Sequence, residues 1–322
     1  MTFNKEQGAR NNKQSLITFP GLQTHKNYDL MELNPFHLSL PGQFRVAVVL
    51  STYNQPLWLT KCLWGYVEQS FDDFEILIAD DGSGPETKGV VRDFQEQSGL
   101  SIRHIWQPDE GFRKCRILNK AIMETDADYL IFSDGDCIPR MDFVGNHVRH
   151  ARPGYFLSGG YLKLNENVSG LITRKDVVNQ RPFSARWLMK HGMSFSHKYM
   201  KLVRNPAFTG FMNRVTTTRT TWNGHNVSGW KSDLLKVNGY NESMNYGGLD
   251  RELGERLVNA GLKGQQIRYY AICVHLDHAR PYKTRDALNK NMARRLSVKS
   301  DKLTWTPDGI LKDGGKKQGK SS

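Results

Sequence analysis

The chain has 322 residues, of which 38% are hydrophobic and 24% are charged, and its formal net charge is +13. This composition is typical of a globular protein and excludes a disordered chain. The positive charge says nothing about the fold, but it makes nucleic acid, anionic lipid headgroups and nucleotide phosphates candidate partners.

The cysteines and the N-terminus narrow the class further. Cys62, Cys115, Cys137 and Cys273 form no Cys-x-x-Cys pair, which argues against a zinc site and against a disulfide framework. The N-terminus lacks the apolar run of a signal peptide. No apolar segment approaches the roughly 20 residues that a membrane-spanning helix needs. We therefore expect a cytoplasmic protein.

Strands and helices alternate over residues 45–150, after a polar N-terminal extension of residues 1–44. The apolar run Val46–Leu50 predicts a strand that is buried on both faces. Further strands are predicted at Glu75–Ala79, Ser101–Trp106 and Tyr129–Ser133, and the helices between them begin at Pro56 or cover Glu86–Gln97 and Arg113–Met123. Such alternation predicts an α/β fold with a mostly parallel central sheet flanked by helices.

The pattern is looser in residues 151–282, which we expect to add an α+β portion to the same domain. No elements are assigned within residues 151–222. Beyond them, a strand is predicted from Asn226, a short helix before Gly239, a helix over Arg251–Ala260 and a last strand over Ile267–Val274. Residues 283–322 carry eleven Lys or Arg against four Asp and read as a basic C-terminal tail, partly disordered from Lys312 onward.

Polar motifs follow three of the predicted strands. They are Thr52-Tyr53-Asn54, Asp80-Asp81-Gly82-Ser83 and Asp134-Gly135-Asp136. The carboxyl ends of parallel strands meet at one edge of a sheet, so we expect the three motifs to converge. The two aspartates of the last motif would repel each other unless a cation lay between them, and oxygen ligands suit Mg²⁺ or Mn²⁺. Helix capping and a polar turn are the alternative interpretations.

These groups fit a nucleoside diphosphate better than other nucleotides. No Gly-x-Gly-x-x-Gly fingerprint and no Walker loop follows the first strand, which argues against an ordinary dinucleotide or P-loop site. Arg113 and Arg116 lie three residues apart on one helix face and could place cations near the phosphates. A solvated helix face is the alternative for these arginines.

Taken together, the motifs resemble an inverting family 2 glycosyltransferase of the GT-A fold. The stretch Asn226–Leu257, with Val-Asn-Gly-Tyr-Asn-Glu and Gly-Gly-Leu-Asp-Arg-Glu, is similar to the galactosyltransferase-like C-terminal module of bacterial chondroitin-polymerase-like enzymes. The resemblance covers roughly residues 45–282. It implies a nucleotide-sugar-binding half, residues 45–150, and an acceptor-binding and catalytic half, residues 151–282.

The resemblance also implies roles on the donor side. The residues that would bind the donor nucleotide of a UDP-sugar are Thr52, Tyr53, Asn54, Asp81, Arg113, Arg116 and Asp134. A Mn²⁺ or Mg²⁺ ion would bind Asp136 and His275, with Asp134 and His278 as further candidate ligands.

On the acceptor side, Asp250 matches the aspartate that acts as the catalytic base in the family. Leu249 stands where the family usually has glutamate, so the resemblance does not determine how this loop recognises the acceptor. Candidate acceptor-binding residues are Trp230, Tyr246, Gly248 and Arg251, and Trp222 is a further aromatic that could stack on a sugar. Core packing is the alternative role for these tryptophans.

These roles predict a metal-dependent inverting hexosyltransferase. It would move a hexose or N-acetylhexosamine from a UDP-sugar to a saccharide or lipid-linked saccharide in the synthesis of envelope polysaccharide or lipopolysaccharide. One alternative is a nucleotide-sugar pyrophosphorylase, although its Gly-rich, Arg-containing first loop is missing here. Another is a basic nucleic-acid-binding protein, but no such motif is present, so we expect no nucleic-acid partner.

The basic tail has two interpretations. It could attract the protein to anionic headgroups on the inner face of the plasma membrane, near a lipid-linked acceptor. Alternatively, its charge could serve solubility alone. We expect the first, as a peripheral contact.

Overall fold

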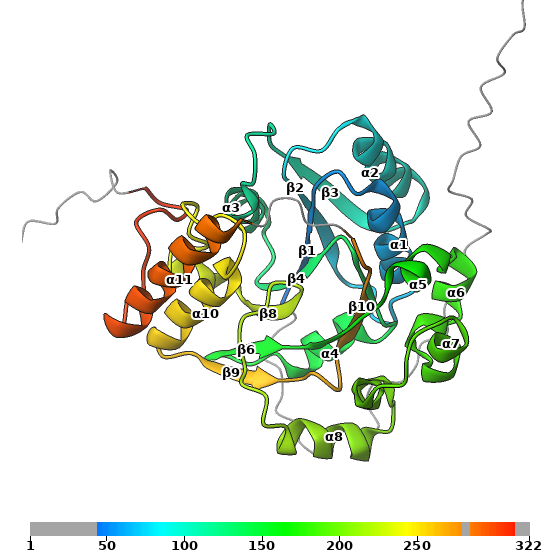
Figure 1. Cartoon of the computed structure of the whole chain (residues 1–322). Helices are drawn as coiled ribbons and strands as arrows, with labels where there is room; N and C mark the ends of the chain where they lie inside the picture. Colours follow the sequence, from blue (N-terminus) through cyan, green and yellow to red (C-terminus); the bar gives the residue numbers. More distant parts are fainter. Residues whose placement is uncertain (1–43, 279–283, 313–322) are drawn as a thin grey trace, which may run out of the picture. The chain divides into compact units, whose positions relative to one another are not determined.

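The computed structural model describes residues 44–278 and 284–312, and these contain a seven-stranded sheet in the order β3-β2-β1-β4-β8-β6-β9 (Figure 1). Its strands are β1 (Val46–Thr52), β2 (Glu75–Asp80), β3 (Ser101–Trp106), β4 (Tyr129–Asp134), β6 (Tyr155–Ser158), β8 (Asn226–Trp230) and β9 (Lys263–Gln266). β1 pairs in parallel with both β2 and β4, and β8 runs antiparallel to its neighbours β4 and β6. The mixed but mostly parallel sheet is the one that the sequence predicts.

Helices connect the parallel strands as the alternating pattern predicts. They are α1 (Pro56–Val67), α2 (Pro85–Gln97) and α3 (Lys114–Glu124), and α4 (Phe143–His150) follows β4 and the short strand β5 (Cys137–Pro139). Every residue of β1 except Ser51 is buried, which explains why its sequence is an unbroken apolar run. The carboxyl ends of β1, β2 and β4 consequently lie along one edge of the sheet.

A second, three-stranded sheet has the order β5-β10-β7. Its strands are β5 (Cys137–Pro139), β7 (Gly160–Lys163) and β10 (Ile272–His275). The single strand predicted over residues 267–274 is therefore wrong, because the chain turns at residues 268–270 and passes from β9 in the large sheet to β10 in the small one. β10 pairs with β5 and so brings His275 opposite Cys137, directly after the Asp-x-Asp motif.

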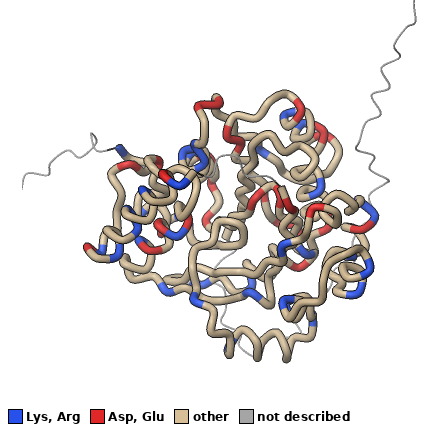
Figure 2. The backbone as a smooth tube through the Cα atoms, viewed as in Figure 1, with Lys and Arg blue, Asp and Glu red and all other residues tan. Residues whose placement is uncertain are grey.

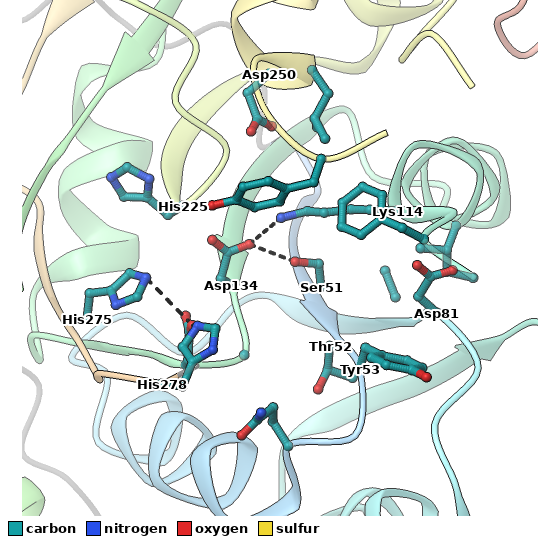
Figure 3. Close-up of a pocket in the computed structure, with 18 of the residues that line it drawn as sticks. Ser51, Thr52, Tyr53, Asp81, Lys114, Asp134, His225, Asp250, His275 and His278 are labelled. Atoms are coloured by element: carbon teal, nitrogen blue, oxygen red, sulfur yellow. Dashed lines mark hydrogen bonds and ion pairs between the residues drawn. The ribbon is translucent and has the colours of Figure 1, made fainter. Parts of the chain in front are cut away.

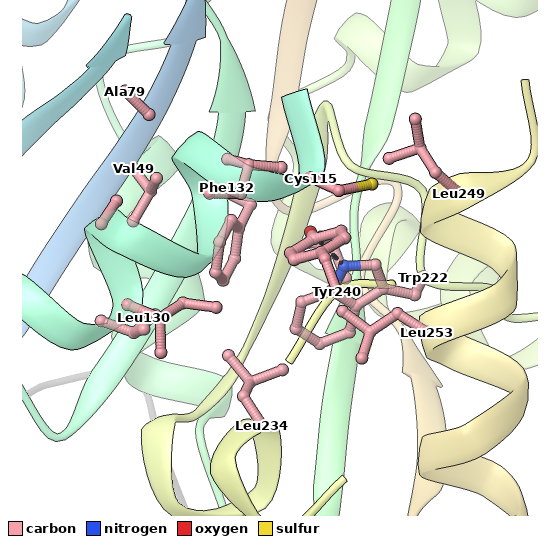
Figure 4. Close-up of a cluster of buried hydrophobic side chains, with 14 of the residues drawn as sticks. Val49, Ala79, Cys115, Leu130, Phe132, Trp222, Leu234, Tyr240, Leu249 and Leu253 are labelled. Atoms are coloured by element: carbon pink, nitrogen blue, oxygen red, sulfur yellow. Dashed lines mark hydrogen bonds between the residues drawn. The ribbon is translucent and has the colours of Figure 1, made fainter. Parts of the chain in front are cut away.

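The main hydrophobic core lies between the large sheet, α3 and α10 (Leu249–Asn259) (Figure 4). Trp222 is fully buried in this core, and its indole N–H donates a hydrogen bond of 2.9 Å to the hydroxyl of Tyr240. A side chain at Gly254 would lie 2.6 Å from the Cβ of Trp222, so α10 packs closely on the indole. Trp222 is thus a core residue and is not placed to stack on a sugar.

Residues 164–216 form short helices, in a region where the sequence predicts no elements. These are α5 (Glu166–Leu171), α6 (Arg174–Val178), η1 (Arg181–Phe183), α7 (Ala185–Lys190), η2 (His197–Leu202) and α8 (Pro206–Val215). Side chains of Asn165, Thr173, Ser184 and Asn205 cap the helices that follow them. Each helix is too short to show a clear apolar period, so the caps are the stronger sequence signal.

Much of the predicted basic tail is folded. Helix α11 (Arg285–Ser300) packs on α10, and Arg295 forms an ion pair of 2.6 Å with Glu255 of α10. The remaining described helix is the short α9 (Lys231–Lys236). The side-chain amide of Asn291 donates to the backbone oxygen of Gly247 at 2.7 Å. Residues 284–312 therefore contain a packed helix that the sequence prediction did not assign, and the residues from 313 onward lie outside the described part. Within the described part, no helix has both the length and the apolar character that crossing a bilayer requires.

Candidate active site

A pocket of about 770 Å³ lies where the three strand-end motifs converge, and the first turn of α10 lies across it (Figure 3). Ser51 and Thr52 come from the end of β1, Asp81 follows β2, and Asp134 ends β4. Most of the predicted site residues line it: Thr52, Tyr53, Asn54, Asp81, Asp134, Asp136, Tyr246, Gly248, Asp250, His275 and His278. Four predicted residues do not: Arg113, Arg116, Trp230 and Arg251.

One side of the pocket is a polar shelf formed by the first two motifs. The carboxylate of Asp81 accepts hydrogen bonds from the side-chain amide of Gln107 at 2.6 Å and from the backbone N–H of Arg113 at 2.9 Å. Tyr53 donates its hydroxyl to Asp109 at 2.7 Å, while its ring stays 42% exposed. An exposed ring beside a fixed carboxylate is suited to holding a planar base and a hydroxylated ring.

The loop that carries Asp109 depends on a glycine. Gly82 has a φ of +97°, and a Cβ on it would lie 2.6 Å from the backbone of Asp109. A residue with a side chain would therefore be strained by its own backbone and would push the loop away. The Asp-Asp-Gly-Ser motif thus has a structural reason for its glycine, in addition to supplying Asp81.

The Asp134 carboxylate is held by a lysine that is absent from the residues predicted for the site. The Lys114 ammonium lies 2.6 Å from Asp134 Oδ1, and the Ser51 hydroxyl donates to the same oxygen at 2.7 Å. Burial by itself would lower the pKa of Lys114, but the nearby carboxylates of Asp134 and Asp250 outweigh it and raise that pKa. Burial likewise opposes ionisation of Asp134, but Lys114 outweighs it and holds the pKa of Asp134 below its usual range. Both groups are therefore charged at neutral pH.

The helix face explains why the lysine replaces the expected arginines. α3 begins at Lys114, and Lys114 and Ile117 both line the pocket. Arg113 and Arg116 are also three residues apart, but they lie on the neighbouring, exposed face. Arg116 pairs with Glu110 at 2.8 Å there. A pair of residues three apart does face the pocket, as predicted, but the pair is Lys114 and Ile117, one residue later than Arg113 and Arg116.

Trp230 and Arg251 also lie outside the pocket. Because β8 runs antiparallel to β4, Trp230 pairs with Tyr129 at the start of β4, at the end of the sheet away from the pocket. Its ring packs edge-on against Phe44 and Tyr129. Arg251 is exposed on α10. Of the predicted acceptor-binding residues, the pocket therefore brings together Tyr246 and Gly248.

Asp136 and two imidazoles form a candidate metal centre. Asp136 Oδ2 lies 2.7 Å from His278 Nε2 and 3.6 Å from His275 Nε2. Ligand atoms of Asp136, Cys137 and His275 also lie within 4.8 Å of one another. Burial raises the pKa of the Cys137 thiol well above its usual value, and a thiolate suits softer metals than Mn²⁺ or Mg²⁺. One carboxylate and two imidazoles fit Mn²⁺ better than Mg²⁺, since Mg²⁺ prefers oxygen ligands.

Asp250 lines the same pocket from the first turn of α10, near Lys114 and Asp134 (Figure 3). Its Oδ1 atom is buried and has no hydrogen-bond partner among the described residues. Burial, reinforced by the charge of Asp134 and opposed by Lys114, raises the pKa of Asp250 to about 6. Gly224, with a φ of +71°, leaves room for the carboxylate, because a Cβ there would lie 2.3 Å from Oδ1. A carboxylate with such a pKa is suited to accept a proton near neutral pH.

His225 is a second residue that sequence reasoning missed. Its ring lies edge-on to Tyr161 at a centroid distance of 4.4 Å, and its Nε2 atom has no hydrogen-bond partner within the described residues. Burial lowers the pKa of His225 to about 4 in spite of nearby Asp134, so the imidazole is neutral. Its loop precedes β8 and lacks a periodic pattern, so no sequence signal placed it in the pocket.

Replacing Lys114 with Met is expected to destabilise the protein by about 2–3 kcal/mol at pH 7, because it leaves the Asp134 carboxylate without its cation. The two side chains are only 21% and 24% exposed. The pKa of Asp134 is depressed in the folded protein, so this stabilisation is present above its ordinary value of 3.8 and is lost as the pH falls below it. Urea unfolding at pH 7 and pH 3 measures the effect.

In the matched control, Arg116→Met, loss of an exposed ion pair should cost less than about 1 kcal/mol. Equal effects of the two substitutions at pH 7 would contradict this role of Lys114.

Comparisons with known proteins agree with this arrangement. Residues 47–214 match the profile described as "Glycosyl transferase family 2". The chain is 27% identical over 235 residues to a validoxylamine A glucosyltransferase of Streptomyces hygroscopicus subsp. jinggangensis, covering 67% of this chain and 52% of that protein. It is 23% identical over 239 residues to a chondroitin synthase of Escherichia coli, covering 67% of this chain and 32% of that protein. The chain thus spans about half of these relatives' length or less.

Solved structures agree on the fold. A crystal structure of GalNAc-T7 with UDP, GalNAc and Mn²⁺ superposes with a TM-score of 0.55 at 12% sequence identity, covering 79% of this chain and 48% of that one. Likeness at this identity bears on the fold alone. The predicted α/β fold of the GT-A type is confirmed.

Proposed function

Because the chain belongs to glycosyl transferase family 2, we propose that it transfers a hexose or N-acetylhexosamine from a UDP-sugar to a saccharide acceptor, with inversion at the anomeric carbon. One observation carries the proposal. The Asp250 carboxylate, with its raised pKa, lies near the Lys114–Asp134 ion pair in a pocket that is also lined by the Asp136, His275 and His278 group and by the polar shelf of Tyr53 and Asp81. A base, a cation site and a nucleotide site in one pocket are the parts that such a transfer requires.

The donor nucleotide would occupy the shelf formed by the first two motifs. The exposed ring of Tyr53 would stack on or border the uracil, and the fixed carboxylate of Asp81 would accept hydrogen bonds from the base or ribose. Asp134, held by Lys114 and Ser51, would lie toward the ribose and diphosphate.

Asp136, His275 and His278 would hold a divalent cation, most suitably Mn²⁺. Mn²⁺ is also present in the GalNAc-T7 structure, which supports this choice. When bound, the cation would stabilise the charge that develops on the diphosphate leaving group, so no side chain need donate a proton to it. The ammonium of Lys114 provides a second positive charge on the same side of the pocket.

Asp250 would act as the general base. Its carboxylate would take the proton of an acceptor hydroxyl while that oxygen bonds to the anomeric carbon and the bond from that carbon to the diphosphate breaks. Attack from the face opposite the leaving group inverts the centre, so an α-linked donor gives a β-linked product. Oδ1 is buried against Gly224, so Oδ2 is the carboxylate oxygen that would reach the acceptor hydroxyl.

The acceptor would enter beside Tyr246 and Gly248. Tyr246 packs edge-on against Phe112, and both rings line the pocket on the side of α10. Leu249, in the place of the family glutamate, is buried in the core, so it contributes packing where a glutamate would offer hydrogen bonds. We propose a saccharide or lipid-linked saccharide of the cell envelope as the acceptor.

A donor screen tests the proposal. UDP release would be followed with Mn²⁺ for UDP-Gal, UDP-Glc, UDP-GalNAc and UDP-GlcNAc, with GDP-mannose as the control nucleotide sugar. We expect slow hydrolysis of one or two UDP-sugars, accelerated by a suitable acceptor, and none of GDP-mannose. Turnover of GDP-mannose alone would contradict the uridine assignment. Failure of every nucleotide sugar to bind would overturn the function itself.

The rate of transfer should depend on the ionisation of Asp250. A general base must be deprotonated to act. Because the pKa of Asp250 is raised to about 6, its carboxylate stays protonated, and inactive, up to a higher pH than an ordinary aspartate. We expect kcat to rise roughly tenfold per pH unit below about pH 5 and to level off above about pH 7. A bound cation would move this fall in rate to lower pH without removing it. A rate that does not fall anywhere between pH 7 and pH 4, with chemistry limiting, would contradict the assignment.

A further inference from the structure

One stretch of the chain is basic throughout. Residues 181–219, named here the basic segment, contain eight Lys or Arg and no Asp or Glu. They are Arg181, Arg186, Lys190, Lys198, Lys201, Arg204, Arg214 and Arg219. The segment contains α7, η2 and α8 along the lower right of the molecule in Figure 1, and Figure 2 shows it without acidic positions. These charges are separate from those of residues 283–322.

Few of these charges are neutralised by the protein. Within the described residues, Arg181 is the member of the segment that forms an ion pair, at 2.9 Å from Asp176. The Lys201 ammonium is turned inward and donates to the backbone oxygen of Tyr161 at 2.6 Å. The remaining six bases form no ion pair with any described residue. They are therefore available to an anionic partner.

The same segment exposes large apolar side chains. Phe195 is 83% exposed and Phe211 is 61% exposed. Further exposed apolar residues of the segment are Met189, Met200, Val203 and Val215. Single exposed apolar residues are ordinary on a protein surface, but a group of six on three successive elements and the loops between them indicates an interaction site.

Helix α8 shows the arrangement most clearly. Ala207, Phe211 and Val215 are spaced by four residues, so they share one helix face, and all three are exposed. Thr209 is the only residue of α8 that is buried. The helix is started by the side-chain cap of Asn205 and by Pro206, so it forms without an apolar face packed on the core. Its apolar face is left for a partner.

We propose that the basic segment docks the protein on an anionic lipid bilayer. Phe195, Phe211 and Val215 would enter the boundary between headgroups and acyl chains, and bases such as Arg204 and Arg214 would contact the phosphates. Exposed apolar side chains interspersed with Lys and Arg along a surface segment are features that bind a membrane interface. A nucleic acid would use the bases but would leave the exposed Met and Val side chains without a role.

The segment also adjoins the active-site pocket. Lys201 holds the backbone of Tyr161 in β7, and Tyr161 and Lys163 of that strand line the pocket. Docking would therefore bring the pocket close to the bilayer. This consequence, which rests on the proposed function, suits an acceptor carried on a lipid.

Vesicle flotation of the full chain tests the docking. We expect the protein to float with vesicles of phosphatidylcholine and phosphatidylglycerol, to bind less at high salt, and not to bind phosphatidylcholine alone. The double variant Phe195→Ser/Phe211→Ser should bind at least roughly tenfold more weakly, because it loses the apolar anchors. Arg204→Ser/Arg214→Ser should lose roughly fivefold per base at low salt.

Matched controls establish whether vesicle binding is specific to this surface. Met123→Ser/Val258→Ser changes apolar residues that are 53% and 51% exposed on α3 and α10, outside the segment, and should leave vesicle binding unchanged. Deleting residues 313–322 should also leave it largely unchanged. Thermal unfolding midpoints and UDP binding of the variants check that the fold and the pocket persist, so failure of docking and failure of the proposed function are distinguishable.

Three results would overturn the proposal. The wild-type protein could fail to bind anionic vesicles, or the Phe195→Ser/Phe211→Ser variant could bind them as the wild type does. Alternatively, the deletion of residues 313–322 could by itself abolish binding. Self-association that the phenylalanine variant removes, without any vesicle binding, would instead make this surface a protein interface.

Discussion

Replacing Asp250 with Asn is expected to abolish sugar transfer while leaving UDP binding intact. The amide has the shape of the carboxylate, so it fits beside Gly224, whose Cβ position lies 2.3 Å from Oδ1. It cannot take a proton from the acceptor hydroxyl, and the loss of a general base reduces the rate by roughly 10²–10⁴-fold. UDP release in the presence of acceptor measures the rate, and calorimetric titration with UDP and Mn²⁺ measures binding.

The matched control is Asp233→Asn. Asp233 lies on α9, and burial raises the pKa of its carboxyl as it does for Asp250, but Asp233 does not line the pocket. This variant should keep its activity. If Asp250→Asn lost UDP binding together with activity, Asp250 would be a donor-binding residue, and if it stayed active, the base would have to be another group.

The donor half of the site could be predicted because the parallel arrangement of the strands determines where its polar motifs lie. Three polar motifs at the ends of β1, β2 and β4 had to meet if the strands were parallel, and the register of β1 with β2 and β4 shows that they do. An apolar run that ends in aspartates predicts both the strand and the residue at which the strand ends, from the local sequence alone. The family resemblance, confirmed by the match over residues 47–214, depends on the same motifs.

The errors arise where long-range geometry decides. Whether Arg113 or Lys114 enters the pocket depends on a rotation of α3 by one residue, which a spacing of three cannot distinguish. The placement of Trp230 depends on β8 being antiparallel to β4, which sends its end away from the pocket. The fold of residues 284–312 depends on contacts with α10 and with Asn238, whose side chain bonds to the backbone of Thr306 and Leu311 at 2.7 and 2.8 Å. None of these contacts is local in sequence.

Replacing Asp136 with Ala is expected to remove metal-dependent donor binding. Asp136 is the carboxylate that both imidazoles of the candidate centre approach, at 2.7 Å for His278 and 3.6 Å for His275. Its loss leaves two neutral ligands and no negative charge to offset the cation. We expect the affinity for Mn²⁺ to fall roughly 100-fold or more, since changes to the outer partners of metal ligands alone cost 10–100-fold. Electron paramagnetic resonance of free Mn²⁺ measures binding without requiring turnover.

The control and the two histidine variants make this prediction specific. Cys137→Ser should leave Mn²⁺ binding unchanged, because Mn²⁺ prefers carboxylate oxygens to a soft sulfur ligand. His275→Ala and His278→Ala, tested separately, identify which imidazole binds the cation, since the affinity falls only when a ligand is removed. If Asp136→Ala kept full Mn²⁺ affinity, the metal centre would have to be elsewhere in the pocket. Asp134 would not replace it at neutral pH without breaking its 2.6 Å ion pair with Lys114.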